Sequence, residues 1–403
     1  MNNNDYDIVI VGAGLVGLLL ACALSDSRLK IAVLDQKGPP NDAHTDRPDL
    51  RVSAITLASQ KILLNLGVWP RIPAERISPF RKMHVWDAAG TGEISFDSAE
   101  VGKQTLGAII ENKVLQKALL EQLKTHDNIE FIYPAQLIGI ESNLENITLA
   151  LSNHMQLTTR LLLGADGAES QVRKLANIEM KQWDYGQNAL VCNVKTTLSH
   201  QQTAWQRFLP DGILAFLPLA NSQECSIVWS TEPQEAQRLL ALETADFKSA
   251  LTAAFEKRMG EITDVSERLS FPLQMRHAKQ YALKHIALVG DAAHTIHPLA
   301  GQGVNLGFLD AATLAEIILA ALKRKQQFDS QMTLRRYERW RKSENMLMLG
   351  VVETIKQLFE KQTVPLQMLR NLGMNMTDNI APVKNYLAKR AMGLVGDLPE
   401  IAK

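Results

Sequence analysis

The first part of the sequence alternates short β-branched runs with a longer apolar stretch. A run from Tyr6 to Val11 ends at Gly12, and an Ala- and Leu-rich stretch from Leu15 to Leu24 follows it. A second β-branched run, from Ile31 to Leu34, stops at Asp35. Short apolar runs bounded by turn residues are typical of buried strands, and a longer apolar stretch between them is typical of a helix. The pattern therefore predicts a strand–helix–strand unit.

The rest of the sequence predicts further helices and a second sheet. The Pro- and Asp-rich segment from Gln36 to Asp49 predicts a loop, and Ser53 to Leu66 predicts a helix closed by Gly67. Alternating apolar and aromatic residues from Met83 to Phe96, and again from Ala189 to Ser230, predict a separate sheet built from remote pieces of chain. The other predicted elements are helices at Asn112–Lys124, at Val304–Lys323 and from Met332 onward, and strands at Leu161–Leu163 and His285–Val289.

Composition and charge limit the class of protein. The chain has 403 residues, 46% of them hydrophobic, which is enough for a large core and an internal pocket. Lys plus Arg and Asp plus Glu both number 43, so no overall basic field favours a nucleic-acid partner. The three separated cysteines, Cys22, Cys192 and Cys225, predict neither disulfides nor a metal site and favour a reducing cytoplasm. Asp5 and Asp7 precede the first apolar stretch, which argues against a signal peptide.

A Gly-x-Gly-x-x-Gly sequence lies between the first predicted strand and the first predicted helix. Gly12 permits a tight turn, Gly14 lets the backbone approach a pyrophosphate, and Gly17 allows close helix packing. The phosphates would lie at the helix N-terminus, and Asp35 follows at the distance where a carboxylate can accept hydrogen bonds from ribose. The motif predicts dinucleotide binding without separating FAD from NAD, and a structural glycine turn is the alternative.

Two more glycine-bearing bends follow predicted strands. The first, Gly164 to Arg173, contains Asp166, and the second, Gly290 to Gly307, contains Asp291. An Asp just past a strand can bind a sugar hydroxyl, and glycines in such a bend bring backbone N–H groups close to a flat ligand. Each bend alone also fits a turn with a helix-capping Asp. Three such bends in this order favour a shared ligand.

With these motifs the sequence resembles the single-component, FAD-dependent aromatic hydroxylases of the p-hydroxybenzoate hydroxylase fold, and among them the ubiquinone-biosynthesis ring hydroxylases. The resemblance covers nearly the whole chain, and the unbroken stretch from His297 to Gly307 is its most specific part. Ser226–Ser230 and the C-terminal segments favour the kind that hydroxylates a 2-polyprenylphenol. The other segments that carry the resemblance are Asp49–Ile55, Gly67–Trp69, Glu111–Gln116, Phe216–Leu219, Ala391–Leu394 and Asp397–Pro399.

The resemblance implies a mixed α/β fold in which a Rossmann-like FAD-binding domain is interleaved with a β-sheet substrate domain. The FAD-binding domain would comprise residues 1–75, 100–182 and 272–330. The substrate domain would comprise residues 76–99 and 183–271, and residues 331–403 would form a C-terminal helical region.

The resemblance also implies the cofactor contacts. The glycines Gly12, Gly14 and Gly17 would hold the FAD pyrophosphate, and Asp35 the adenosine ribose. Asp291 would bind the ribityl chain. The residues expected to line the rest of the cofactor are Arg51, Lys113, Asp166, Gly301, Gly303, Val304 and Asn305.

The residues expected beside the reacting atoms lie in one loop. They are His297, Pro298, Gly301 and Gln302. Lys113, by contrast, stands where relatives often have Arg. Lysine keeps the positive charge but loses the planar, bidentate fork, so the charge carries over and the geometry does not.

The implied activity is hydroxylation of the aromatic ring of a polyprenylphenol in ubiquinone biosynthesis. NAD(P)H would be the reductant and dioxygen (O2) the co-substrate, and reduced FAD would form a flavin hydroperoxide. No metal is expected. The expected partners are other ubiquinone-biosynthesis enzymes, a lipid carrier or membrane surface, and a second copy of the chain. The expected location is the cytoplasm or the periphery of the inner membrane.

Three alternatives stay open. The chain hydroxylates another ring position in the same pathway, is a flavin-dependent halogenase or reductase, or is a non-catalytic lipid-binding or assembly protein. The six tryptophans include no Trp-x-Trp pair, which halogenases usually carry, so the halogenase is disfavoured.

Some residues also keep more than one interpretation. His294 and His297 are either the base that deprotonates a phenol or residues that orient their loop. The methionines from Met346 to Met392 line a polyprenyl channel, fill the core or form a subunit interface. The basic run around Trp340 is a solvated helix face or a membrane contact.

Overall fold

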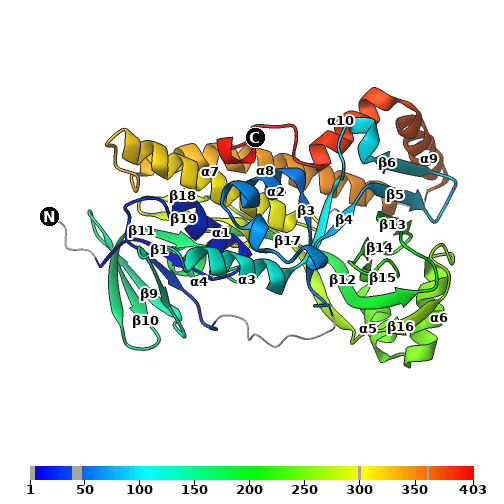
Figure 1. Ribbon diagram of the computed structural model, residues 1–403, viewed down its shortest axis with the longest axis horizontal. Coiled ribbons are helices and arrows are strands. Elements are labelled where there is room, and N and C mark those ends of the chain that lie inside the picture. The colour runs from blue at the N-terminus through cyan, green and yellow to red at the C-terminus, as the bar shows by residue number, and fades with distance from the viewer. Residues whose placement is uncertain (1–4, 39–47, 298–300, 361–362) are drawn as a thin grey trace.

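The computed structural model describes residues 5–38, 48–297, 301–360 and 363–403. Within these residues the strands form three sheets, of eight, nine and three strands. The eight-stranded sheet lies on one side of the molecule and the nine-stranded sheet on the other, and helices α7 (Gly303–Lys323) and α8 (Gln331–Glu360) run above them (Figure 1). The mixed α/β fold predicted from the sequence is confirmed.

Parallel strands form the centre of the eight-stranded sheet. Strand β1 pairs in parallel with β2 on one side and with β11 on the other, and β11 pairs in parallel with β19. The turns that follow β1, β11 and β19 therefore lie at one edge of the sheet. The strands of this sheet are β1 (Tyr6–Val11), β2 (Ile31–Leu34), β8 (Ile129–Ile132), β9 (Leu137–Ser142), β10 (Ile147–Leu151), β11 (Gln156–Gly164), β18 (Ala282–Leu283) and β19 (Ile286–Leu288).

Helix α1 (Leu15–Leu24) packs against α3 (Asn112–Leu123) and α7. Helix α1 is apolar on every face, as is typical of a core helix that neighbouring elements cover. Among the described helices only α7 is long and apolar enough to span a membrane, and 72% of its most apolar window is buried within the protein. We therefore interpret α7 as a core helix.

The three-stranded sheet corrects one sequence prediction. Residues Val52–Thr56 form strand β3, which pairs antiparallel with β7 (Gly107–Glu111), and β7 also pairs with β4 (Ser78–Phe80). The helix predicted over Ser53–Leu66 begins only at Leu57, as α2 (Leu57–Asn65). Thr56 separates the two elements because its side-chain oxygen accepts a hydrogen bond from the backbone N–H of Ser59 and caps the helix.

The nine-stranded sheet joins the two remote segments, as predicted. Strand β5 pairs in parallel with β13, although more than a hundred residues separate them. Helices α5 (Pro233–Ala241) and α6 (Thr244–Ala254) pack on this sheet. In spatial order its main strands are β20 (His294–Thr295), β17 (Leu269–Ala278), β12 (Met180–Thr196), β15 (Glu224–Thr231), β14 (Gly212–Pro218), β13 (Thr203–Leu209), β5 (Lys82–Asp87) and β6 (Glu93–Asp97), and β16 (Ile262–Val265) pairs with β12.

The sheets do not follow the domain boundaries that we placed on the sequence. Strand β17 runs across the boundary at residue 272, and β20 joins the nine-stranded sheet from inside the range 272–330. Strand β4 lies within residues 76–99 but pairs with β7. Backbone pairing between remote strands decides these memberships, and local residue patterns do not reveal it.

The C-terminal region is helical, as predicted, and consists of α8, α9 (Val364–Asn379) and α10 (Ala381–Ala391). Phe359 of α8 stacks on Phe208 of β13 with ring centroids 3.7 Å apart. The remaining helices are short: α4 (Gln171–Leu175) and 3-10 helices at Trp69–Arg71, Ala74–Arg76, Ser98–Val101, Gly290–Ala292 and Glu400–Ala402.

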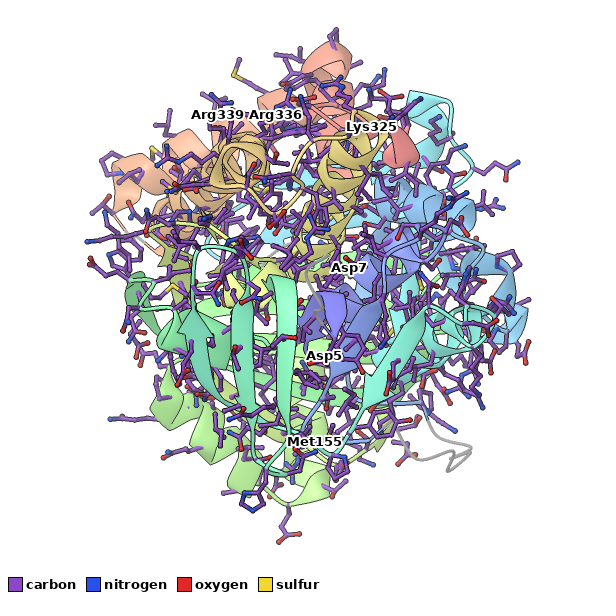
Figure 2. All side chains as sticks on the ribbon, turned by 90° about the vertical axis from the view of Figure 1, so that its left-hand side faces the viewer. Asp5, Asp7, Met155, Lys325, Arg336 and Arg339 are labelled. Carbon is purple, nitrogen blue, oxygen red and sulfur yellow. The ribbon has the colours of Figure 1, made fainter. Side chains whose placement is uncertain are left out.

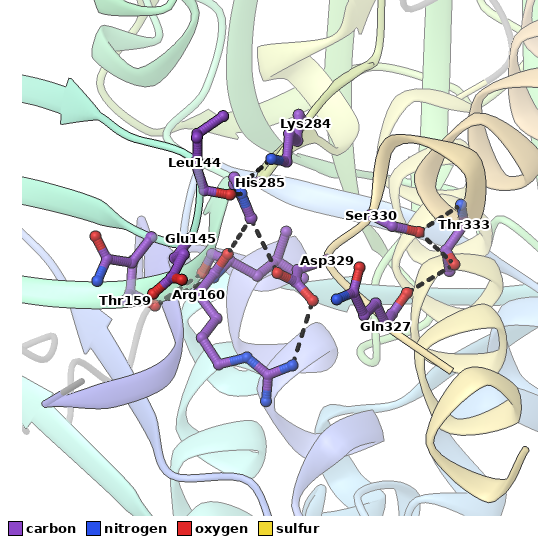
Figure 3. A network of polar contacts seen from close by, with 12 residues as sticks. Leu144, Glu145, Thr159, Arg160, Lys284, His285, Gln327, Asp329, Ser330 and Thr333 are labelled. Atoms are coloured by element: carbon purple, nitrogen blue, oxygen red, sulfur yellow. Dashed lines mark hydrogen bonds and ion pairs between the residues drawn. The ribbon is translucent and has the colours of Figure 1, made fainter. Parts of the chain in front are cut away.

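A polar network closes the edge of the parallel sheet where β1 begins (Figure 3). The guanidinium of Arg160 lies 3.3 Å from Asp329 and 3.5 Å from Asp7, and Nδ1 of His285 lies 2.9 Å from Asp329. A cavity of about 690 Å³ opens here, where Figure 2 shows Asp5 and Asp7. Since these charged groups pair with one another at the edge opposite the glycine bends, we assign the network a structural role.

Candidate cofactor and active site

The first two glycine bends contact each other closely. Gly12 has a φ of +107°, and a Cβ on it would lie 2.4 Å from the carbonyl oxygen of Ala165 in the second bend. A Cβ on Gly17 would lie 1.9 Å from the carbonyl oxygen of Gly12. A side chain on Gly12 would push the second bend away, and one on Gly17 would collide with the first bend itself, which explains why glycine stands at both positions.

The third bend packs against the first. A Cβ on Gly307 would lie 2.6 Å from Cγ2 of Val16, and one on Gly290 would lie 3.1 Å from the same atom. Arg173 of the second bend donates hydrogen bonds to the carbonyl oxygens of Ala292 and Ala168, at 3.0 and 2.8 Å. The three bends therefore form one contiguous structure.

Asn305 attaches the start of α7 to strand β3. Its Oδ1 accepts a hydrogen bond from the backbone N–H of Thr56 at 3.0 Å, and its Nδ2 donates to the carbonyl oxygens of Ala54 and Gly301, at 2.7 and 3.0 Å. The side chain of Asn305 therefore bonds to the protein backbone, and it holds the carbonyl group of Gly301 close to strand β3.

Open space remains where a ligand is expected. Among the described residues, and apart from the adjoining chain, no heavy atom lies within 4 Å of an ideal Cβ built on Gly14 or on Gly303. Neither of the helices that begin there, α1 and α7, has a side-chain cap, a feature that they share with α3, α5, α6, α9 and α10. The first N–H groups of such a helix can bind water or a ligand, and the helix dipole favours an anion. The geometry therefore fits the phosphate end of a dinucleotide.

Asp291 faces the same space. Its side chain is exposed although the residue lies deep in the molecule, so the carboxylate borders an internal opening. Burial raises the pKa of Asp291, and the charges of His294 and Arg51 oppose this shift. Arg51 is itself exposed, on the chain just before β3. A carboxylate here can accept hydrogen bonds from ligand hydroxyls, as the ribityl role requires.

The two other predicted acidic residues hold the bends in shape. Asp35 accepts hydrogen bonds from the backbone N–H groups of Ala13 and Lys37, both at 2.7 Å. Oδ2 of Asp166 accepts from the N–H of Gln171 at 2.6 Å, while its buried Oδ1 has no partner among the described residues. That free oxygen still requires a donor.

Lys113 forms an exposed ion pair. Its side chain is 68% exposed, and its amine lies 3.6 Å from Oδ1 of Asp49. The structure thus shows an exposed ion pair at the position where we predicted a cofactor contact.

The predicted catalytic residues that the structure describes contact different parts of the protein. Nε2 of buried His297 lies 3.2 Å from Oε1 of Gln187, and the ring packs edge-on against Tyr185. Burial, followed by the charge of Lys356, lowers the pKa of His297 to about 4. The amide of Gln302 donates to the carbonyl oxygen of Ala391 at 3.2 Å. Pro298 lies outside the described residues.

A buried ionic cluster supports the third bend, and sequence reasoning missed it. Oδ2 of Asp310 accepts a hydrogen bond from the N–H of Gly290 at 3.1 Å and lies 2.5 Å from Nε2 of His294. Its Oδ1 accepts from Nε of Arg341 at 2.8 Å and from Nδ2 of Asn345 at 3.1 Å. Burial alone would raise the pKa of Asp310, but His294 and Arg341 lower it to about 2. The ring of His294 therefore pairs with Asp310 and helps to hold the third bend in place.

Gln116 was also missed as a functional residue, although it closes a segment that carried the resemblance. Its Nε2 donates to the carbonyl oxygen of Ala13 at 2.8 Å and holds the first bend from α3.

These features fit one class of protein, a flavoprotein in which the carboxyl edge of a parallel sheet receives a dinucleotide. The sequence matches the FAD binding domain family over residues 5–348. It is 36% identical to the 3-demethoxyubiquinol 3-hydroxylase of Escherichia coli, with 98% of this chain and 100% of that protein covered. It is 34% identical to the ubiquinone hydroxylase UbiL of Rhodospirillum rubrum, with 98% and 91% covered.

The fold is similar to the crystal structure of p-nitrophenol 4-monooxygenase PnpA from Pseudomonas putida, with a TM-score of 0.79, 19% identity, and 96% and 98% of the two chains covered. The chain therefore belongs to the FAD binding domain family and is an FAD-dependent monooxygenase. The predicted resemblance to the FAD-dependent aromatic hydroxylases is confirmed. NAD(P)H and dioxygen are the typical co-substrates of this family.

Proposed function

We propose that this protein hydroxylates the aromatic ring of a polyprenylated phenol during ubiquinone biosynthesis. The observation that carries the proposal is the convergence of the three bends around open space at Gly14, Gly303 and Asp291. Relatives named for ubiquinone-pathway hydroxylation that match nearly the whole chain support the substrate class.

Each bend would bind one part of FAD. The N-terminus of α1 at Gly14 would receive the pyrophosphate, Asp35 would receive the adenosine ribose, and Asp291 would accept hydrogen bonds from the ribityl hydroxyls. When bound and reduced by NAD(P)H, FAD supplies the activation of dioxygen. The protein residues then orient the ring and exclude water.

The start of α7 would stabilise negative charge. Its uncapped N–H groups begin at Gly303, and the positive end of the helix dipole lies there. Preorganised donors of this kind stabilise an anionic ring edge without reorganising. Val304 and Asn305 continue the same turn, and the amide of Gln302 fixes its entry by the bond to Ala391.

We further propose that His297 positions the loop and does not act as the base. With a pKa of about 4 its ring is neutral near neutral pH and accepts protons weakly. Gln187 and Tyr185 hold the ring in place, and His297 directly precedes Pro298 in the sequence.

A single-turnover assay tests the proposal. The FAD-loaded protein is mixed with NADPH, ¹⁸O₂ and a prenylphenol, and the product is analysed by mass spectrometry. We expect one labelled oxygen in the ring and NADPH oxidation that the phenol accelerates. Hydrogen peroxide as the only oxygen product would contradict hydroxylation, and a protein that binds no FAD would favour the non-catalytic alternative.

A second candidate is hydroxylation at another ring position. It is favoured by the Escherichia coli relative, whose name specifies position 3 of a demethoxyubiquinol. Mass spectrometry of the quinone intermediate that accumulates in a deletion strain separates the candidates. If an unhydroxylated polyprenylphenol accumulates, the substrate is the polyprenylphenol. If a demethoxyubiquinol accumulates, the second candidate is supported.

A further inference from the structure

One face of the nine-stranded sheet is covered by helices α5 and α6. Phe216 of β14 and Ile227 of β15 pack there in one apolar cluster with Leu239 of α5 and Phe247 of α6. Side chains alternate between the two faces along a strand, so the residues next to Phe216 and Ile227 point away from these helices. We name the side to which they point the inner face.

Strand register places four residues side by side on the inner face. Gln206 of β13 pairs with Ala215 of β14, and Ala215 pairs with Val228 of β15. Val228 in turn pairs with Val191 of β12. Directly paired residues point to the same side of a sheet, and Ala215 directly precedes Phe216. The four residues therefore form one row across the inner face.

Other elements cover the inner face on both sides of this row. On one side, Phe208 of β13 stacks on Phe359 of α8. On the other side, Ser78 of β4 and Leu219, just after β14, border a common cavity of about 180 Å³. The row thus lies between α8 and the three-stranded sheet.

The inner face stays open between these two contacts. Ala215, Leu217 and Val228 keep accessible surface, although β14 and β15 are interior strands of the sheet. Since α5 and α6 cover the other face, this surface borders an internal opening. Val228 also packs against the cluster that contains Tyr185, whose ring meets His297 edge-on. The opening therefore lies close to the loop in which the reacting residues are expected.

Two buried polar side chains of the inner face have no partner within the described residues. Gln206 is only 6% exposed, and its side-chain amide forms no hydrogen bond there. Ser226 is 1% exposed, stands two residues before Val228 on β15, and has an unpartnered Oγ. Buried polar groups need hydrogen bonds, and an amide can both donate and accept them. A ligand hydroxyl beside Ala215 would supply what Gln206 lacks.

The same face carries no unpaired charge among the described residues. On β13, β14, β15 and the part of β12 from Gln187 onward, its charged residues are Lys195 and Glu224, which pair at 3.3 Å. Lys356 of α8 approaches from above, and its amine lies over the ring of Tyr185, 4.8 Å from the ring centroid. These strands thus offer no free cation to a ring carboxylate, and burial of a carboxylate without a partner is costly.

We propose that the opening on the inner face binds the aromatic ring of the substrate and that the amide of Gln206 hydrogen-bonds the phenol hydroxyl. Ala215, Leu217 and Val228 pack against the apolar part of the ring. The site selects an uncharged phenol over a ring that carries a carboxylate. This inference rests on the proposed function and names the residue that recognises its substrate.

Equilibrium titration of the oxidised, FAD-loaded protein tests the role of Gln206 without turnover. The change in flavin absorbance measures the Kd of 2-geranylphenol and that of geranylbenzene, which lacks the hydroxyl. The wild type should bind the phenol about tenfold more tightly. In Gln206→Leu this preference should fall below about twofold. The control is Gln122→Leu, which removes a surface amide bonded to Arg71 and should keep the wild-type preference.

A carboxylated probe tests the selection against charge. The compound 3-geranyl-4-hydroxybenzoate differs from 2-geranylphenol only by its carboxylate and should bind the wild type at least about tenfold more weakly. Leu217→Arg adds a guanidinium to the opening and should reduce this difference to about twofold or less. Leu198→Arg adds the same charge at a position that is 53% exposed and should keep the wild-type difference. Because each preference is a ratio of two Kd values for one protein, partial unfolding of a variant does not change it.

Three results would overturn the inference: no binding of 2-geranylphenol by the wild type, an unchanged preference for the hydroxyl in Gln206→Leu, or equal binding of the two phenols by the wild type. Failure of the proposed function gives a different result. If the phenol binds with the expected preferences but gains no labelled oxygen, hydroxylation fails and the binding site stands. If product forms with the same KM in the wild type and in Gln206→Leu, hydroxylation stands and the role of Gln206 fails.

Discussion

The cofactor edge, where the three glycine bends meet at the end of the parallel sheet, and helix α9 both turn polar residues inward, but they differ in what they leave outside. At the cofactor edge, buried Asp310 and Arg341 hold backbone bends in place, and open space faces the glycines. On α9, polar residues also face inward, but apolar side chains are left outside. The first region leaves open space beside its glycines, and the second leaves apolar side chains uncovered among the described residues. Burial of charge alone therefore does not locate a site.

The largest expected effect is a loss of stability when the buried ionic cluster is broken, compared with the loss when a surface ion pair is broken. Asp310→Ala leaves Arg341 buried and unpaired, which we expect to lower the free energy of unfolding by about 3–5 kcal/mol and to release FAD. The control is Glu344→Ala, which breaks a partly exposed pair with Arg390 at 3.0 Å and should cost less than about 1 kcal/mol. Urea unfolding measures both. Equal losses would show that the cluster does not support the bend.

Acid pH should weaken the wild-type protein through buried histidines. Burial lowers the pKa of both His277 and His297 to about 4, from an ordinary value of 6.5. The unfolded chain therefore binds these protons first, and the stability present above pH 6.5 falls as the pH drops toward 4. We expect a loss of about 3 kcal/mol for each histidine.

The variants His277→Asn and His297→Asn should each remove their own share of this pH dependence. Asp310, with a pKa of about 2 against an ordinary 3.8, contributes only at the lower end of this range, where the carboxyl of the unfolded chain begins to bind its proton. Unfolding titrations at a series of pH values measure the slope. A slope that is unchanged in both variants would show that these imidazoles are protonated in the folded protein.

A variant of His297 tests whether this residue is a base or only orients its loop. If this residue only orients its loop, His297→Asn should keep the shape of the pH profile of kcat/KM and lower its height by less than about tenfold, as expected for one lost hydrogen bond. His200→Asn, which alters a buried histidine bonded to the carbonyl oxygens of Leu219 and Asn221, is the control. Disappearance of one limb of the profile in His297→Asn would make His297 the base.

The smallest effect concerns Lys113. Because its amine is exposed and pairs with Asp49, Lys113→Arg should change the dissociation constant of FAD by less than about threefold. Fluorescence titration of the apoprotein measures it. A gain of tenfold or more would show that the bound state draws this side chain toward the cofactor.

Local patterns predicted the cofactor edge well. The strand from Tyr6 to Val11 and the helix from Leu15 to Leu24 have the predicted bounds, because β-branched runs and turn glycines act locally. The meeting of the three bends also follows from parallel strands that end at one edge. The strand at Val52–Thr56 was missed because its pairing with β7 lies remote in the chain.

Long-range partners explain the other omissions. Asp310 lies in an apolar helical pattern, and its partners His294 and Arg341 stand in separate parts of the sequence. No local signal distinguishes it from a surface carboxylate. The orientation of α9, which turns its polar face toward the protein, could not be predicted from the sequence for the same reason. Its polar residues bond to strand β6, which lies far away in the chain.

Flavin content of a Gly14→Leu variant tests the central claim, that the bends surround a bound FAD. Among the described residues other than its chain neighbours, no heavy atom lies within 4 Å of a Cβ at Gly14, so a side chain there starts in open space and extends into the volume assigned to the pyrophosphate. Gly373→Leu, at a position that is equally open, is the control. The account predicts a folded, colourless Gly14→Leu protein and a yellow Gly373→Leu protein. A yellow Gly14→Leu protein with wild-type affinity for FAD would contradict it.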